Sequence, residues 1–133
     1  MAQLKDLTIE LEDKAGTVAA AAEALGKAGV NIEAFCGLAV DGKGIAHIVV
    51  ADAAKARQAL ETAGARVVNE QPALVLDIED KPGALGKLTR KIADAGVNLT
   101  AVYLATRTRV VINARDLEKA RAAAAGEGAA TRQ

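Results

Sequence analysis

Residues 79–83 read EDKPG, and a closely similar stretch, EDKAG, stands 67 positions earlier at residues 12–16. The sequence AGVN shows the same spacing, since it occurs at residues 28–31 and again at residues 95–98. The two matches hold one register, so neither copy has an insertion between them. Self-similarity at a fixed period indicates an internal repeat, and the sequence therefore predicts two copies of one small unit.

The second copy is shorter than the first. The pattern DxxKAR occurs at residues 52–57 and again at residues 116–121, an offset of 64 positions instead of 67. Residues 41–44 read DGKG, a strong hairpin-turn signal, and only a shorter turn at residues 106–108 corresponds to it. The three missing residues are therefore expected in this hairpin.

Each copy is predicted to run strand, helix, strand, strand, helix. Apolar residues at every second position of residues 7–11 and 74–78 favour half-buried first strands. Each following helix carries an apolar stripe and is expected to end at a glycine. The remaining predicted elements are second strands at 32–40 and 99–105, third strands at 45–50 and 109–114, and second helices that start at the N-cap residues Asp52 and Asp116.

The order βαββαβ predicts an α+β fold of two ferredoxin-like units in tandem, each an antiparallel sheet with helices on one face. Only the first copy shows a fourth strand, at residues 66–70, and the second unit lacks its own. We assign residues 1–70 to unit 1, residues 74–125 to unit 2 and residues 126–133 to a disordered tail.

The short linker after residue 70 leaves two alternatives for residues 66–70. They form an ordinary fourth strand of the first sheet, or they lie between the two first strands and join both sheets into one seven-stranded sheet.

The composition excludes several classes of function. The 17 basic and 17 acidic side chains cancel, so no net field attracts nucleic acid or an anionic membrane. No apolar stretch reaches the roughly 18 residues of a membrane span, and no signal peptide follows Met1. We therefore expect a cytoplasmic protein.

The single cysteine, Cys36, and the single histidine, His47, offer little for chemistry. They allow no internal disulfide, no multi-cysteine metal site and no obvious catalytic constellation. We expect Cys36 to be a small buried hydrophobe and His47 a structural histidine. The sequence thus predicts no catalytic residue, no bound metal and no cofactor.

The two bends between first strand and first helix are the candidate binding sites. Gly16 and Gly83 let the backbone approach a ligand, because glycine has no Cβ. The free N–H groups at the start of a helix suit a carboxylate, and the carboxylates of Asp13 and Asp80 can accept from an ammonium group. The alternative is structural, since the same residue types are ordinary turn formers.

These paired motifs resemble the ACT domain family, and most closely the regulatory ACT domain of phosphoglycerate dehydrogenase. The resemblance covers about residues 4–70 and 74–121. It implies a small regulatory ligand, usually a free amino acid, bound where ACT units meet, and it implies frequent homodimers. It also implies the ligand-binding residues, which are Asp13, Lys14, Ala15, Gly16, Asn31, Ile32, Asp80, Lys81, Pro82, Gly83, Asn98 and Leu99.

The leading hypothesis is therefore a non-enzymatic sensor of amino acids that acts on itself or on an unnamed partner enzyme. A structural interaction module with vestigial pockets is the main alternative. RNA binding on this fold needs exposed aromatic residues on the central strands, and the third strands at 45–50 and 109–114 have none. A small enzyme needs a nucleophile with a base, or paired carboxylates in a site, and no such pattern is evident.

A predicted surface patch favours a homodimer. Four apolar residues are expected on the sheet face of unit 2 that turns away from the helices, where polar residues are usual. They are Val75, Val102, Leu104 and Val111.

Overall fold

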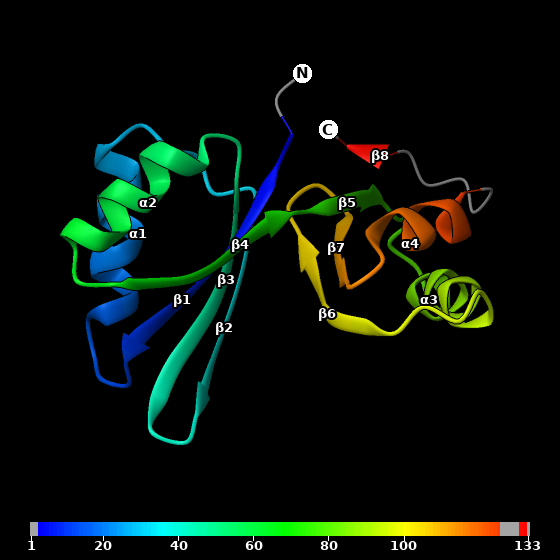
Figure 1. The fold of residues 1–133 in the computed structure, drawn as a ribbon, viewed down its shortest axis with the longest axis horizontal. Coiled ribbons are helices and arrows are strands. Elements are labelled where there is room, and N and C mark those ends of the chain that lie inside the picture. Colours follow the sequence, from blue (N-terminus) through cyan, green and yellow to red (C-terminus); the bar gives the residue numbers. More distant parts are fainter. Residues whose placement is uncertain (1–2, 126–130, 133) are drawn as a thin grey trace. The chain divides into compact units, whose positions relative to one another are not determined.

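The structure is a computed structural model and describes residues 3–125 and 131–132. Contacts between residues divide the chain into two compact units, Met1–Pro72 and Ala73–Gln133, which are called unit 1 and unit 2 below. Both are α+β, and Figure 1 shows that two helices cover one face of the sheet in each unit. The predicted fold class is confirmed.

Unit 1 has four strands and two helices, in the chain order β1 (Lys5–Glu12), α1 (Thr17–Lys27), β2 (Ala34–Val40), β3 (Lys43–Val50), α2 (Ala53–Thr62) and β4 (Arg66–Pro72). The strands are hydrogen-bonded in the order β2-β3-β1-β4, and all neighbours are antiparallel. The strands β2 and β4 are therefore the edges of this sheet.

Unit 2 repeats this order with β5 (Leu74–Asp77), α3 (Ala84–Asp94), β6 (Leu99–Ala105), β7 (Arg109–Ala114), α4 (Leu117–Ala124) and β8 (Thr131–Arg132). Its strand order is β6-β7-β5-β8. In place of a strand as long as β4, this sheet has only the two-residue β8, which pairs with Val75 and Leu76. The rest of the predicted tail at 126–133 lies outside the described residues.

The strand β4 belongs to unit 1 alone. It pairs with β1 from Lys5 opposite Pro72 to Glu10 opposite Arg66, whereas β5 pairs with β7 and β8. The alternative of one seven-stranded sheet is therefore wrong. Because β4 runs on to Pro72, only Ala73 precedes β5, and a hairpin between these strands would need a loop of about two residues.

Each unit has its own hydrophobic core between sheet and helices. The predicted alternation is confirmed, because every second residue of β1 and β3 points into the core of unit 1 together with apolar residues of both helices. This core includes Leu7, Ile9, Leu25, Ile48, Val50 and Leu60. The core of unit 2 has the same construction and includes Leu74, Leu76, Leu88, Ile92, Val110 and Ile112.

The first helix of each unit ends as the sequence predicts. Gly29 and Gly96 follow the last turns of α1 and α3 with φ angles of 75° and 77°, the left-handed conformation that favours glycine at this position. Among the described residues, no helix has the length and apolar character that a membrane span requires.

The outer sheet face of unit 2 differs from the prediction. Val102 and Leu104 pair in register with core residues of β7, so they lie on the helix face of the sheet at the exposed edge strand β6. A register shift after Leu99 reverses the alternation, as an inserted residue in a strand does. Val75 and Val111 do face away from the helices, as predicted. The predicted patch is therefore wrong for Val102 and Leu104.

Candidate functional site

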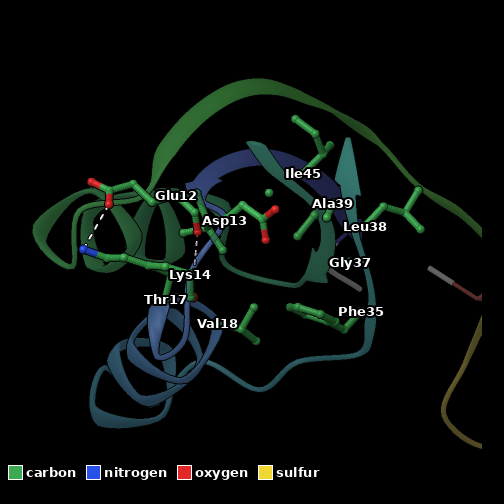
Figure 2. Close-up of a pocket in the computed structure, with 13 residues that line it drawn as sticks. Glu12, Asp13, Lys14, Thr17, Val18, Phe35, Gly37, Leu38, Ala39 and Ile45 are labelled. Atoms are coloured by element: carbon green, nitrogen blue, oxygen red, sulfur yellow. Dashed lines mark hydrogen bonds and ion pairs between the residues drawn. The ribbon is translucent and has the colours of Figure 1, made fainter. Parts of the chain in front are cut away.

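Each unit has a surface hollow at the bend between its first strand and its first helix. In unit 1 the hollow has a volume of about 290 Å³ and lies between the end of β1, the first turn of α1 and the edge strand β2 (Figure 2). Its lining includes Leu11, Asp13, Thr17, Val18, Phe35 and Gly37. The corresponding hollow of unit 2 measures about 320 Å³, and its lining includes Ile78, Asp80, Ala84, Leu85 and Leu104.

The two hollows occupy the same place in the repeat. Asp13 and Asp80 stand 67 positions apart, and both line their hollows directly after the first strand. Leu104 stands 67 positions after Gly37, so a leucine of β6 replaces the glycine of β2. The duplication has therefore produced two versions of one cavity with different walls.

The backbone at the two bends is the same in both units. Gly16 has φ 94° and ψ −15°, and Gly83 has φ 89° and ψ −14°. This holds although Ala15 precedes the first glycine and Pro82 the second. A Cβ added at either glycine would meet no atom within 4 Å, so the space beside both bends is open.

The helices that start at these bends differ from the other two helices. Asp52 and Asp116 cap α2 and α4, since their carboxylates accept the backbone N–H of the third residue on at 3.1 and 3.0 Å. The predicted N-caps are thus confirmed. Within the described part of the chain, no side chain caps α1 or α3. The first N–H group of each of these two helices donates within the bend, from Thr17 to Lys14 O at 3.5 Å and from Ala84 to Lys81 O at 3.2 Å. The next residues, Val18 and Leu85, line the hollows, and uncapped N–H groups at a helix start can bind an anion.

The lysines of the two motifs pair with neighbouring glutamates. Lys14 Nζ lies 3.0 Å from Glu12 Oε2, and Lys81 Nζ lies 2.9 Å from Glu79 Oε2. The hydrogen bond and charge of Lys81 hold the pKa of the Glu79 carboxyl below its ordinary value. In Figure 2 the ammonium group of Lys14 points toward Glu12, whereas the Asp13 carboxylate points toward the β2 side of the hollow.

The remaining predicted residues lie at the other end of the first helices. Asn31 and Ile32 follow the C-terminus of α1, and Asn98 and Leu99 occupy the equivalent place after α3. Since α1 has 11 residues, roughly 16 Å separates its two ends. Asn31 also donates a hydrogen bond to Glu33 Oε2 at 2.8 Å. Within one unit, the aspartate and the asparagine therefore cannot contact the same small ligand.

Residues 2–125 match the family model of the ACT domain pair. The chain belongs to the ACT domain pair family. The family resemblance read from the repeated motifs is thereby confirmed over nearly the whole sequence. No curated protein matches the chain.

Solved structures show the same architecture as this ACT domain pair. A protein from Bacteroides thetaiotaomicron is 27% identical with a TM-score of 0.82, and the match covers 98% of this chain and 93% of that one. The regulatory subunit of aspartate kinase from Thermus flavus is 17% identical with a TM-score of 0.72 and coverages of 96% and 94%. The ligand-free Thermus thermophilus subunit is 18% identical with a TM-score of 0.71 and coverages of 93% and 91%. None of these three supports the narrower resemblance to phosphoglycerate dehydrogenase.

Sequence reasoning missed the apolar side of the unit 1 hollow. Val18 of α1 and Phe35 of β2 line it and are 49% and 36% exposed. The spacing of the repeated EDK(A/P)G and AGVN motifs does not indicate that either residue lies at the binding site. One signal was present, because Phe35 is one of only two aromatic residues in the chain and stands two positions before Gly37 on an edge strand.

His47 of the ACT domain pair has an acidic partner that the sequence did not predict. Its Nδ1 lies 3.0 Å from Oδ1 of the buried Asp6 and 3.4 Å from Thr8 Oγ1, on the sheet face away from the helices. The hydrogen bond with Asp6 raises the pKa of His47, although burial of the ring opposes this. Cys36, directly opposite His47 on β2, is only half-buried. Across the described residues, no three His, Cys, Asp or Glu side chains are placed to hold a metal ion.

The His47–Asp6 pair predicts a pH-dependent stability. Because the pKa of His47 is raised in the folded state, its protonated form stabilises unit 1. This contribution is complete below the unfolded pKa of about 6.5 and is lost as the pH rises through the folded value. We expect the melting temperature of the wild type to fall as the pH rises above the unfolded pKa of about 6.5. The variant His47→Gln should show a smaller fall, and an equal fall in both proteins would contradict the assignment.

Proposed function

We propose that this ACT domain pair is a regulatory protein that binds a free amino acid in the hollows at the β1–α1 and β5–α3 bends. The observation that carries the proposal is the contrast between its helices. Aspartates cap α2 and α4, while α1 and α3 start uncapped at left-handed glycines. The glycines themselves do not line the hollows, but the residues on either side of the bends do, namely Lys14 and Thr17 in unit 1 and Lys81 and Ala84 in unit 2. A helix start that is left open in this way suits an anionic ligand.

A zwitterionic head group fits the groups at the bend. Its carboxylate can accept hydrogen bonds from the N–H groups of the first helical turn, where the helix dipole is positive. Its ammonium group can donate to the carboxylate of Asp13 in unit 1 or Asp80 in unit 2, both of which line the hollows. Volumes of about 290 and 320 Å³ lie at the small end of ligand pockets, which suits a single amino acid.

We further propose that the asparagines contribute from a different unit. Asn31 and Asn98 lie a helix length from the bend of their own unit, so they can reach a ligand only at a bend that another unit supplies. A ligand held in this way would join two units. We therefore expect a homodimer in which ligand binding favours one arrangement of the units, and thereby changes the protein itself or a partner enzyme.

The solved regulatory subunits of aspartate kinase are consistent with a partner enzyme for this chain. The similarity to these subunits shows a shared fold. We propose, in addition, that this ACT domain pair acts on a separate enzyme. The Asp13 and Asp80 carboxylates give the proposal its first test, because both line the hollows.

The test is a melting-temperature screen of the full chain with each of the twenty amino acids at millimolar concentration. A ligand present at 100 times its dissociation constant stabilises the protein by about 2.7 kcal/mol, a readily measured shift. Calorimetry should then show that Asp13→Asn or Asp80→Asn weakens binding about tenfold or more, because the charged hydrogen bond to the ammonium is lost.

The exposed Asp94 of α3 provides the matched control, since it pairs with Arg90 and lines neither hollow. The variant Asp94→Asn should bind like the wild type. If no amino acid shifts the melting temperature, the proposed function is wrong. If all three aspartate variants lose affinity equally, the ligand does not bind at the bends.

A further inference from the structure

We infer that the hollow of unit 1 selects an amino acid with an apolar side chain, and that Phe35, lying across Gly37, is the wall that recognises it. This inference rests on the proposed function and adds the class of ligand. It concerns unit 1, because the equivalent wall of unit 2 has a different construction.

The hollow of unit 1 has a polar end and an apolar end. Asp13 and the uncapped start of α1 form the polar end. Figure 2 shows the side chains of Val18 and Phe35 next to each other, below the Asp13 carboxylate. A free amino acid also has a polar end and a side-chain end. Its ammonium and carboxylate groups are both attached to the Cα, and its side chain extends from the same atom in a different direction. With the head group at the bend, an apolar side chain can lie against Val18 and Phe35.

The ring of Phe35 is placed by the glycine beside it. Residues two apart on a strand share one face, so Phe35 and Gly37 both face the helix side of β2. A Cβ built at Gly37 would lie 3.2 Å from Phe35 Cε1, closer than an ordinary contact, and 3.6 Å from Cζ, an ordinary one. The ring therefore lies over the glycine backbone, and a larger residue at position 37 would displace it or fill the hollow.

Unit 2 naturally has a larger residue at the position that corresponds to Gly37. Val102 and Leu104 occupy the positions of Phe35 and Gly37, and the Leu104 side chain lines the hollow while 63% exposed. The unit 2 hollow thus has a flexible aliphatic side chain where unit 1 has a flat ring over a glycine. The two hollows are therefore expected to differ in the ligand side chain that they prefer.

The exposed apolar side chains of the unit 1 hollow favour a ligand with an apolar side chain. Phe35 and Val18 are 36% and 49% exposed at the hollow, so a ligand side chain that covers them removes apolar surface from water. Each methylene buried in this way raises affinity about fourfold. A leucine side chain should therefore bind at least about tenfold more tightly than the methyl group of alanine.

The experiment is calorimetry on the full chain with alanine, leucine, phenylalanine, aspartate and lysine as probes. The wild type should bind leucine or phenylalanine at least about tenfold more tightly than alanine or aspartate at the site whose affinity Asp13→Asn lowers. Gly37→Leu, which installs the unit 2 residue, should abolish this preference. Phe35→Ala should reduce the preference. Val68→Ala, at an exposed residue of β4 that lines neither hollow, should leave it unchanged.

Melting curves establish that each variant folds. If Phe35→Ala does not fold, Phe35→Leu replaces it, because leucine keeps an apolar side chain but has no ring. Gly37→Ala is the milder partner of Gly37→Leu, because its Cβ meets only the movable end of the Phe35 ring.

Failure of this inference is distinguishable from failure of the proposed function. If no probe binds, both fall together. If probes bind at the Asp13 site but the wild type does not prefer leucine or phenylalanine, the apolar selection is wrong and amino-acid binding stands. If Gly37→Leu keeps the wild-type preference, Phe35 and Gly37 are not the wall that selects the ligand, and the inference is wrong as well. If Phe35→Ala lowers the molecular mass in light scattering without changing the ranking, Phe35 lies in a contact between copies and the inference is overturned.

Discussion

Leu25→Ala should lower the free energy of unfolding of unit 1 by about 2–5 kcal/mol, and Ile92→Ala should do the same in unit 2. The two residues stand 67 positions apart in the repeat, lie in α1 and α3, and are 0% exposed in their cores. Each truncation removes buried methyl groups and leaves a cavity that a close-packed core cannot fill. Because a unit of this size is only marginally stable, the loss is a large fraction of its total stability.

Urea unfolding followed by circular dichroism measures this loss. Leu104→Ala is the matched control for Leu25→Ala, because it makes the same chemical change at a residue that is 63% exposed. It should change the unfolding free energy by no more than about 0.5 kcal/mol. If the two variants are equally stable, Leu25 is not a core residue in solution and the packing of α1 on its sheet is wrong.

Local features of the sequence predicted most of the fold. The alternation at Leu7, Ile9 and Leu11 needs only the geometry of a strand, and the caps at Asp52 and Asp116 need only the N–H groups of the helix that each one starts. The duplication strengthened the prediction of each strand and helix, because each local pattern occurs twice. The structure therefore agrees with the predicted order of strands and helices in both units.

Features that depend on pairing between distant residues could not be predicted. The register shift after Leu99 leaves no mark in the sequence, yet it decides which face Val102 and Leu104 occupy. The ion pair of Asp6 with His47 depends on the register of β1 against β3. In each case, long-range hydrogen bonding and not local composition determines the result.

The candidate site was predicted in part. The bend at Asp13 and Gly16 was identified from its motif, and the structure places a hollow there. Val18 and Phe35 come to the same hollow from a helix and an edge strand, so no single stretch of sequence joins them. The separation of Asn31 from the bend, in contrast, follows from the length of the predicted helix and was available in advance.

Replacing the two bend glycines with alanine should lower the free energy of unfolding, whereas replacing the two helix glycines with alanine should raise it. Gly16→Ala and Gly83→Ala are expected to destabilise their units by about 1–2 kcal/mol, because φ angles of 94° and 89° bring a Cβ too close to the backbone. Gly26→Ala in α1 and Gly86→Ala in α3 should stabilise by about 0.4–1 kcal/mol, because alanine fits the helix and restricts the unfolded chain. Urea unfolding of the four variants measures both effects.

The comparison isolates backbone conformation, because a Cβ at any of these four glycines meets no atom within 4 Å outside the local helix. Crowding by neighbouring side chains therefore cannot account for a difference in sign. If Gly16→Ala is as stable as Gly26→Ala, the first bend does not hold its left-handed turn in solution, and α1 starts at a different residue. The N–H groups that are proposed to receive the ligand carboxylate would then point elsewhere, so the same measurement tests the geometry on which binding at the bends depends.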